Sequence, residues 1–268
     1  MSPKKERVKR PSPKRILSGS DEPIFNVLPE RVLANLRSPA SENALLWNLI
    51  YPLAQPNINI TKLLKLRPMW GTLELPETFE DELKPYFWGY SIDGDRLMSL
   101  DEVLVEVDGP GLKTEVDLFL LGERNVVLVE AKHIGGLGRC KRYAQHRCPE
   151  IHRATEEPEE ICRYWNAEAV PFTSYLEFGP RPEPGEEIPP CHRHYQLART
   201  LLVGRSLATR LRLQLHLWLV VPRGRWRSFE KDWLDFSDRV RDDKLWRRLR
   251  VIAWEDVREL PSGVPERD

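Results

Sequence analysis

The sequence predicts an α/β layer fold around one largely mixed sheet. The first observation is that strand-like apolar segments alternate with helix-like segments, which is typical of layered α/β domains. The second is that three strand-like segments follow one another between residues 101 and 133, which favours antiparallel neighbours in that sheet. The third is the length of 268 residues, which suits one large domain.

The bulk composition is that of a soluble domain with a basic N-terminal arm. Hydrophobic residues make up 41% of the chain and charged residues 31%, and the formal net charge is zero. Residues 1–20 hold seven basic side chains against one acidic side chain, Glu6. We expect this Pro-, Ser- and Lys/Arg-rich segment to be a disordered tail, and residues 21–268 to form a single domain. The tail either contacts a polyanion or merely aids solubility.

The sequence shows no recognisable membrane or secretory segment. The N-terminus has no apolar stretch after its basic start, and LHLWLVV at 215–221 is far too short to span a bilayer. Four cysteines without a secretory signal favour a reducing compartment, in which they are thiols or metal ligands. We therefore expect a cytoplasmic protein without a membrane partner.

Helical patterns dominate the first part of the chain. A short helix is expected within residues 24–36, and Ser41 has the position of an N-cap for the segment ENALLWNLIYPL. The apolar face of that second helix consists of Leu45, Leu46, Leu49 and Ile50. Pro52 and Pro56 are expected to end it, and residues 57–100 give only weak signals.

Strands and helices are then expected to alternate to the end of the chain. The strands DEVLVEV, KTEVDLFLL and NVVLVEAKH are separated by the turn-like segments DGPG and GER. Residues 135–190 are rich in Pro, Cys and His without sustained periodicity, which indicates an insertion. A helix is expected at 193–211, with Leu197, Leu201, Ala208 and Leu211 as its core contacts. A buried strand in LQLHLWLVVP, a helical region at 229–248 and a short strand in RVIAWEDV complete the pattern.

The second and third of these strands form a hairpin with an unusual distribution of charge. A four-residue loop at 122–125 pairs Leu121 with Val126 and therefore places Asp117 directly across from Glu130. Cross-strand neighbours have Cβ atoms roughly 4.5–5.5 Å apart. Two carboxylates at that spacing repel each other unless a cation lies between them, and Mg²⁺ meets this requirement.

Lys132 adds a basic group to this pair of carboxylates. It lies two residues beyond Glu130 and on the same face of the strand. Its ammonium would there orient or deprotonate a metal-bound water, or steady a phosphate. Glu115 points to the same side as Asp117, but the pairing does not require it. The alternative is an edge hairpin whose charged face is simply solvated.

An Asp on one strand followed by Glu-x-Lys on the next resembles the PD-(D/E)xK nuclease superfamily. The matching residues are Asp117, Glu130 and Lys132, and Val116 stands where the motif has its Pro. The resemblance covers about residues 41–255, with the core elements in the order usual for the superfamily. It implies the restriction-endonuclease-like fold, an α/β fold with a mixed central sheet flanked by helices, to which this chain adds the Cys/His-rich insertion.

The resemblance also implies roles for individual residues. Asp117 and Glu130 would ligate Mg²⁺, or Mn²⁺ in its place, and Lys132 would assist the attacking water. Members of the superfamily usually carry a Glu on a preceding helix, and Glu42 would contribute to the metal directly or through water. They often carry a Gln or a basic residue on the following helix, and Gln196 in HYQLAR would contact the substrate phosphate or a metal-bound water.

Alternatives stay open for the residues on the two helices. An acid in the first turn of a helix is favoured by the helix dipole, which gives Glu42 a purely structural explanation. Gln145 in RYAQHR lies closer to the motif than Gln196, although Gln196 belongs to the better-formed helix. Arg199, one turn after Gln196, would share its face and could grip a phosphate.

The cysteines raise the question of a second metal. All four, Cys140, Cys148, Cys162 and Cys191, lie in or next to the insertion together with several histidines. Zn²⁺ prefers such ligands, and a metal would close a long loop that has little apolar periodicity. The spacings match no paired C-x-x-C pattern, so ordinary thiols are the alternative. Some nucleases of the superfamily carry an iron–sulfur cluster, but the cysteine spacing here differs.

These observations predict a Mg²⁺-dependent endonuclease that hydrolyses phosphodiester bonds of DNA. Arginines in VPRGRWR and RDDKLWRRLR would add phosphate contacts, although the second segment reads more simply as a helix with one solvated face. Two other classes stay open. One is a catalytically inactive nuclease-like domain that binds nucleic acid or a protein partner, and the other is a zinc-organised interaction module. Because dimers are common in the superfamily, a homodimer is a further expectation.

Overall fold

A single mixed sheet forms the centre of the structure. The computed structural model describes residues 17–55, 60–72, 82–111, 113–152, 161–185 and 188–260. Within these residues six strands pair in the order β1-β6-β5-β4-β3-β2. Most of the expected basic tail, residues 1–20, lies outside the described residues.

The strands are β1 (Trp70–Gly71), β2 (Lys84–Phe87), β3 (Leu118–Leu121), β4 (Asn125–Ala131), β5 (Gln214–Val221) and β6 (Leu249–Ala253). The neighbours β4, β5 and β6 run parallel, whereas β1, β2 and β3 join the sheet antiparallel. Every residue of β4 and β6 is buried, as expected for parallel strands covered on both faces. The mixed α/β sheet confirms the predicted fold class.

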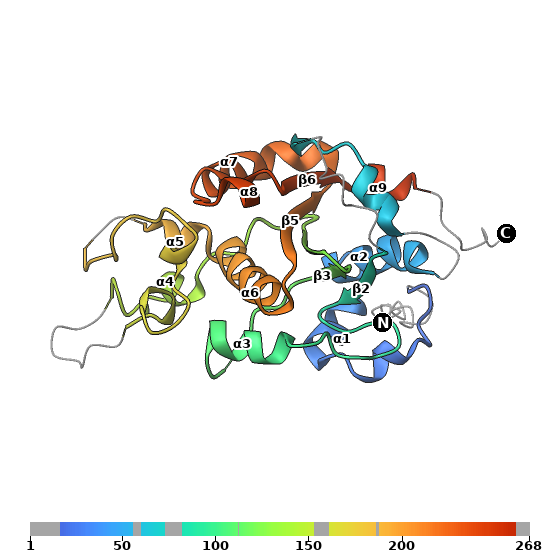
Figure 1. Ribbon diagram of the computed structural model, residues 1–268, viewed down its shortest axis with the longest axis horizontal. Helices are drawn as coiled ribbons and strands as arrows, with labels where there is room; N and C mark the ends of the chain where they lie inside the picture. Colours follow the sequence, from blue (N-terminus) through green and yellow to red (C-terminus); the bar gives the residue numbers. More distant parts are fainter. Residues whose placement is uncertain are drawn as a thin grey trace, which may run out of the picture.

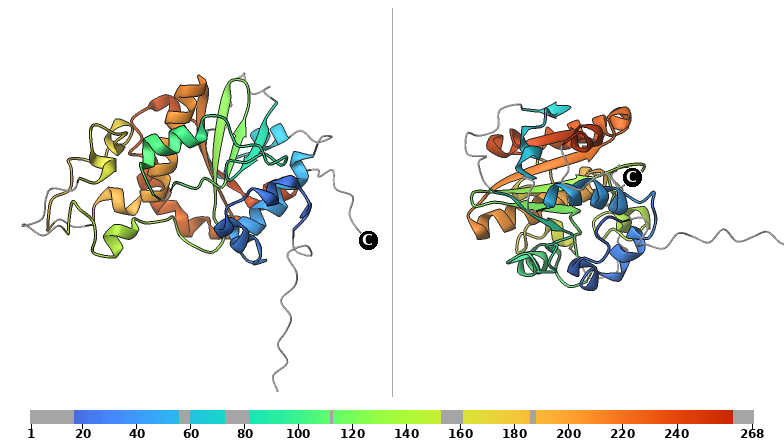
Figure 2. Two further views of the ribbon diagram at one scale, coloured as in Figure 1. Left: turned by 90° about the horizontal axis from the view of Figure 1, so that it is seen from below. Right: turned by 90° about the vertical axis from the view of Figure 1, so that its right-hand side faces the viewer.

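The helices are α1 (Glu30–Leu36), α2 (Glu42–Ile50), α3 (Leu100–Asp108), α4 (Lys141–Ala144), α5 (Pro190–Arg193), α6 (Tyr195–Leu211), α7 (Trp226–Ser237), α8 (Asp243–Trp246) and α9 (Trp254–Arg258). Short 3₁₀ segments are η2 (Pro23–Asn26), η3 (Tyr51–Ala54), η4 (Ile60–Lys65), η5 (Arg163–Trp165), η6 (Phe172–Ser174) and η7 (Arg223–Arg225). Figures 1 and 2 show α4 and α5 at one end of the molecule, away from α1 and α2. Among the described residues, no helix is long and apolar enough to cross a bilayer.

Two hydrophobic cores lie on opposite faces of the sheet. One core joins α3, α6 and α7 to Phe119, Val126 and Leu128 of the hairpin. The other joins α1, α2 and α9 to Leu118, Leu120 and Val127. The alternation along β3 and β4 therefore sends successive apolar side chains to different cores. The hairpin is not an edge with one wet face.

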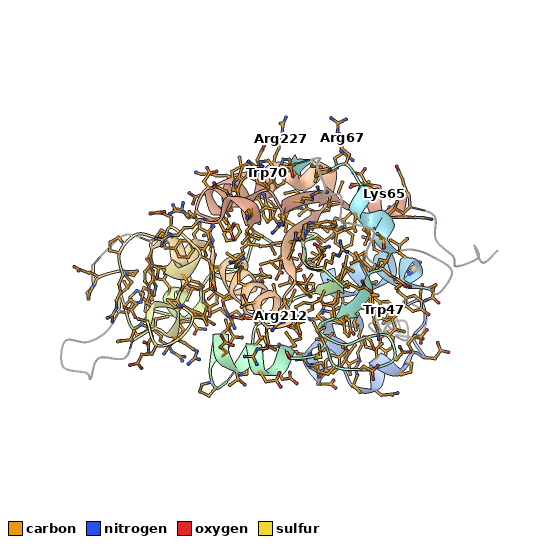
Figure 3. All side chains as sticks on the ribbon, viewed as in Figure 1. Trp47, Lys65, Arg67, Trp70, Arg212 and Arg227 are labelled. Atoms are coloured by element: carbon orange, nitrogen blue, oxygen red, sulfur yellow. The ribbon has the colours of Figure 1, made fainter. Side chains whose placement is uncertain are left out.

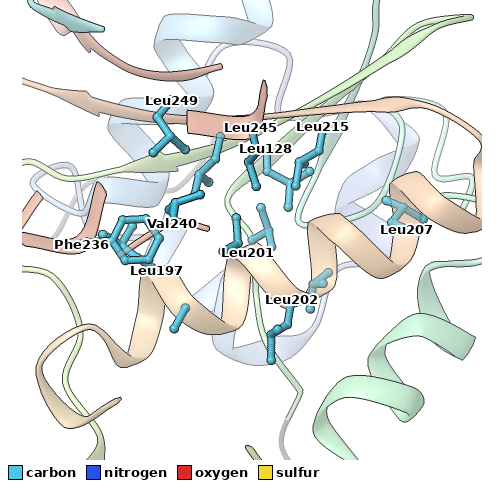
Figure 4. Packing of buried hydrophobic residues seen from close by; sticks show 14 of the residues in the cluster. Leu128, Leu197, Leu201, Leu202, Leu207, Leu215, Phe236, Val240, Leu245 and Leu249 are labelled. Atoms are coloured by element: carbon cyan, nitrogen blue, oxygen red, sulfur yellow. The ribbon is translucent and has the colours of Figure 1, made fainter. Parts of the chain in front are cut away.

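The long helix α6 forms the cover of the first core. Its expected core residues Leu197, Leu201 and Ala208 are buried, and Figure 4 shows Leu197 and Leu201 packed beneath the sheet strands. Gly204 lies at the closest approach, because a Cβ there would come within 2.7 Å of Leu215 Cδ1 and 3.0 Å of Leu128 Cδ2. The helix can thus lie tightly against β4 and β5.

Helix α2 forms part of the second core. Trp47 is fully buried, packs edge-on against Phe25 and donates a hydrogen bond from Nε1 to the Ser18 carbonyl at 2.7 Å. Figure 3 shows Trp47 in the interior of the molecule. At the start of the helix the Ser41 hydroxyl accepts a hydrogen bond from the Ala44 amide, which confirms the predicted N-cap.

The segment DEVLVEV is a helix, and the strand expected there is wrong. It belongs to α3, in which Leu100, Val103, Leu104 and Val107 are buried at helical spacing. Val105, which a half-buried strand would have placed beside Val103 and Val107, is 57% exposed. The alternating valines coincide with a helical pattern that begins one residue earlier, at Leu100. The acidic residues in the first turn add a favourable interaction with the helix dipole.

Three other elements differ from expectation in extent. The strand expected from residue 113 begins only at Leu118, and Val116 packs with Phe119 instead of sharing a face with Leu118. The helical region at 229–248 is two helices, α7 and α8. The final segment RVIAWEDV divides into β6 and α9. In each case the change of element falls where the chain reaches the end of the sheet or of the core.

We expect the Ser41→Ala variant to lose about 1 kcal/mol of unfolding free energy, because an amide at the start of α2 loses its acceptor. Urea denaturation of the variant measures the loss. Ser99→Ala is the matched control, since Ser99 precedes α3 without a side-chain cap hydrogen bond. Equal losses in the two variants would contradict a capping role for Ser41.

Candidate active site

The hairpin register brings two carboxylates together at one end of the sheet. Leu121 pairs with Val126 and Leu118 with Val129, as predicted. Asp117 lies just before the first paired residue of β3, and its side chain reaches the end of β4 beside Glu130. The Asp117 Oδ2 accepts a hydrogen bond from the Ala131 amide at 2.8 Å, and Glu130 is within hydrogen-bonding reach of the same carboxyl group.

Glu130 is completely buried and is held by two donors from α6. The Thr200 hydroxyl donates to Oε1 at 2.6 Å, and the Gln196 side-chain amide donates to Oε2 at 2.7 Å. Gln196 and Thr200 are four residues apart, so they lie one above the other on the face of α6 that meets β4. The helix therefore fixes both oxygens of the carboxylate.

Lys132 and Glu42 complete the cluster. The Lys132 Nζ lies 3.5 Å from Glu42 Oε2 and 4.0 Å from Glu130 Oε2. Glu42 is the first residue of α2, and its Oε1 accepts a hydrogen bond from the His133 amide at 2.9 Å. Its side chain is 29% exposed, compared with 9% for Lys132 and none for Glu130. The cluster consequently reaches solvent on the Glu42 side.

The carboxyl groups of this cluster outnumber its basic groups. Burial is the main cause that raises the pKa of Glu130 to about 8. The nearby Asp117 contributes to this increase, and Lys132 opposes it only in part. Burial likewise raises the pKa of Asp117. Burial disfavours the charge of Lys132, but Asp117, Glu130 and Glu42 outweigh that effect and raise its pKa. Three carboxyl groups thus surround one ammonium.

The composition of the cluster fits a hard divalent cation. Carboxylate oxygens are the ligands that Mg²⁺ and Mn²⁺ prefer, and a bound cation would favour the ionised form of the buried carboxyl groups. Among the described residues, however, no three His, Cys, Asp or Glu side chains are grouped closely enough to hold a metal ion as they stand. The oxygens of Glu130 are instead occupied by N–H and O–H donors, so a cation would have to displace or share some of these contacts.

Both helices therefore supply residues to the cluster, as the sequence predicted for Glu42 and Gln196. Gln145 lies at the end of α4 and is exposed, so Gln196 is the glutamine that reaches Glu130. Sequence reasoning did not identify Thr200. The signal that could have found it is its position one helical turn after Gln196.

Arg199 does not face the acidic cluster. Its guanidinium donates to the buried Asp108 at 3.0 Å and lies 5.0 Å from the centre of the Tyr195 ring. Arg199 follows Gln196 by three residues and points toward α3. Thr200 follows it by four residues and contacts Glu130. The phosphate contact expected of Arg199 thus lacks support, and its contacts tie α6 to α3. Glu115 also lies outside the cluster, paired with Arg31 at 3.2 Å.

Of the two arginine-rich segments, VPRGRWR lies at the same end of the sheet as the acidic cluster. It follows β5, which runs parallel to β4 with Ala131 opposite Val220. The Arg225 guanidinium donates to the Ile134 carbonyl at 3.0 Å, and Figure 3 shows Arg227 pointing outward. The segment RDDKLWRRLR lies at the start of β6, at the other end of the strands, and Arg250 is buried there.

The four cysteines lie apart from the acidic cluster. All of them are free thiols, and they border one small cavity inside the insertion. The expected gathering of Cys140, Cys148, Cys162 and Cys191 is thus observed, whereas a bound zinc ion stays a prediction.

Comparison with known proteins gives one match. The model of a family described as "Restriction Endonuclease associating with ARP" (REase-ARP) matches residues 32–266. No curated protein and no solved structure matches the chain significantly. The matched range contains Glu42, Asp117, Glu130, Lys132 and Gln196.

For the metal-free protein we expect the unfolding free energy to fall as the pH rises from about 4.5 toward about 8. In that window the Glu130 carboxyl ionises in the unfolded chain but keeps its proton in the folded one, so the stability that this proton provides is lost as the pH passes the folded-state pKa. Glu130→Gln should flatten this part of the profile. Denaturant titrations at several pH values measure it.

The control for that experiment is Glu123→Gln, an exposed glutamate in the turn of the same hairpin. Its pH profile should run parallel to that of the wild type. If Glu130→Gln also runs parallel to the wild type, the buried carboxyl group does not titrate in this window and the raised pKa of Glu130 is incorrect.

Proposed function

The chain belongs to the REase-ARP family, and we propose that it is a metal-dependent nuclease of the PD-(D/E)xK type that hydrolyses phosphodiester bonds of DNA. The observation that carries the proposal is the cluster of Asp117, Glu130, Glu42 and Lys132 at one end of the sheet. Restriction endonucleases act on DNA, which makes DNA the substrate that the family description favours.

Asp117 and Glu130 would hold the divalent cation, and Glu42 would contribute directly or through a water molecule. A bound Mg²⁺ or Mn²⁺ would supply positive charge near the phosphoryl oxygens and make the attacking water more acidic. The partial exposure of Glu42 gives the substrate an approach to the cluster from that side. The excess of carboxyl groups over ammonium groups supports this assignment.

Lys132 would act as a charged donor. The surrounding carboxylates raise its pKa, so its ammonium keeps its proton at neutral pH. It would then orient the attacking water or donate to a phosphoryl oxygen that gains charge in the transition state. Its main chain is fixed on both sides, because its amide donates to the Val220 carbonyl at 2.9 Å and its carbonyl accepts from Trp254 Nε1 at 3.0 Å.

Gln196 and Thr200 would position Glu130 for metal binding. Their hydrogen bonds set the plane of its carboxylate and favour its charged form, against the effect of burial. Gln196 donates to Oε2, the oxygen of Glu130 that lies 4.0 Å from Lys132 Nζ, and its amide would also be close to a phosphate bound at this end of the cluster. These two residues are therefore positioning residues in this proposal.

Exposed arginines near the cluster would contact the DNA backbone. Arg225 and Arg227 follow β5, and their guanidinium groups lie at the end of the sheet that carries the acids. Such contacts would be independent of sequence and weakened by salt. They supply affinity and alignment, whereas the acidic cluster supplies the chemistry.

A second candidate function is a domain that binds without cleaving. It is favoured by the hydrogen bonds that already occupy both oxygens of Glu130, since these would compete with a metal. The family description also names an association with ARP, and we propose that this chain associates with such a partner in either case.

The Lys132→Ala and Asp117→Asn variants should cleave DNA at least about 100-fold more slowly than the wild type, because each removes charge stabilisation from the transition state. Cleavage of supercoiled plasmid, single-stranded DNA and RNA in Mg²⁺ or Mn²⁺ measures the rates. Glu115→Gln is the matched control: this neighbouring carboxylate pairs with Arg31 outside the cluster, and its variant should keep the wild-type rate. Equal rates in all variants, or no metal-dependent cleavage, would exclude the enzyme.

Metal binding can be tested without activity. Mg²⁺ should raise the melting temperature of the wild type, since a ligand that binds the folded state alone stabilises it. Asp117→Asn should abolish most of this shift, whereas the exposed Glu123→Gln should keep it. A shift that survives in Asp117→Asn would place the cation elsewhere. The absence of both a shift and cleavage in the wild type would select the non-cleaving domain.

A further inference from the structure

The insertion between β4 and α6 has little regular secondary structure. In its described part, residues 135–152, 161–185 and 188–189, the regular elements are only α4, η5 and η6, of three or four residues each. No strand of the six-stranded sheet lies in it. Tyr164, Phe172, Leu176 and Phe178 join part of this segment to the first core, and a bound metal would stabilise the remainder.

A small cavity inside this insertion collects every cysteine of the chain. Its volume is about 20 Å³, and Cys140, Cys148, Cys162 and Cys191 line it. These four residues come from four separate segments that span about fifty residues of sequence. A wall of aromatic side chains closes the cavity: Tyr143, Tyr164, Trp165, Phe172 and Tyr195.

Backbone N–H groups lie close to the sulfurs of Cys140 and Cys162. The backbone amides of Arg142 and Tyr143 donate toward Cys140. The backbone amide of Tyr164 lies close to Cys162. Burial raises the pKa of the Cys140 thiol and raises the pKa of Cys162 and Cys191 to about 12, so these thiols keep their protons in the metal-free protein, and a metal would have to displace those protons to bind the sulfurs. Donors directed at sulfur are the kind of second-layer contact that thiolate ligands of a metal use.

The other polar groups of the cavity are engaged elsewhere. Glu150 accepts from the Cys162 amide at 2.6 Å and pairs with Arg181. The His192 ring nitrogen Nδ1 contacts the Cys140 carbonyl at 3.2 Å. The four sulfurs are thus the set of potential ligands that face the cavity without another evident task.

We propose that Cys140, Cys148, Cys162 and Cys191 bind one Zn²⁺ ion as a structural tetrathiolate site. Four thiolates in a tetrahedron are a preferred set for zinc. The cavity is about the size of one water molecule, which suits a single ion. As they stand, no three of these side chains are grouped closely enough to hold an ion, so the sulfurs would move inward on binding.

Zinc at this position would also anchor the start of α6. Cys191 lies in α5, which leads directly into α6, and the Cys140 amide donates to the His192 carbonyl at 3.1 Å. Two residues before Cys140, the Gly138 amide donates to Gln196 Oε1 at 2.8 Å. The ion would therefore tie both ends of the insertion to the helix that holds Glu130.

Elemental analysis of the purified full-length protein tests the site directly. We expect about one zinc per chain, retained after dialysis against a weak chelator. Cys162→Ser and Cys191→Ser should lose most of this zinc. Asp117→Asn, which changes the acidic cluster, should keep it, so a failure of the nuclease proposal and a failure of the zinc proposal give different results.

Two measurements on the unchanged chain avoid the risk that the cysteine variants do not fold. Replacement of zinc by Co²⁺ should produce the intense sulfur-to-metal charge-transfer absorption of a thiolate site. Native protein should react slowly with a thiol reagent, and a strong chelator should release all four thiols together. Absence of metal with four independently reactive thiols, iron with sulfide instead of zinc, or full zinc content in both cysteine variants would overturn the proposal.

Discussion

The burial of the Glu130 carboxyl group beside Asp117 is the constraint on which the site depends. An isolated buried carboxylate is strongly unfavourable, and a second one at cross-strand distance makes it worse. Lys132 offsets part of this cost, as do the hydroxyl and amide donors from α6. These compensations are incomplete, because the pKa of Glu130 is still raised to about 8 at one end of an otherwise apolar hairpin. Such an arrangement is unfavourable for stability alone, and it becomes favourable once a cation is bound.

The position of the acids follows from the architecture of the sheet. Parallel strands β4, β5 and β6 are covered by helices on both faces, so polar side chains can reach solvent only at the strand ends. Ligands bind beyond the carboxyl ends of strands in open α/β sheets for this reason. Glu130 and Lys132 stand at that end of β4, and the first turn of α2 brings Glu42 to the same place.

The hairpin could be predicted from sequence because turn length and alternation together fix a register, and the pairing of Leu121 with Val126 follows. The helix α3 could not, because its three valines alternate as in a strand while their burial follows a helix from Leu100. The choice between Arg199 and Thr200 as the neighbour of Glu130 was also not predicted. It depends on how α6 is rotated against the sheet, and the sequence of the helix alone does not fix that rotation.

That rotation links the acidic cluster to the insertion. Successive residues of a helix are about 100° apart, so a shift of α6 by one residue would carry Gln196 and Thr200 off Glu130 together. Contact of Gly204 with Leu215 sets the distance of the helix from the sheet but does not fix its rotation. The rotation is held at the start of the helix, where Gly138 donates to Gln196 and α5 joins the insertion. The conformation of the insertion therefore bears on how Glu130 is presented, although the two sites share no residue.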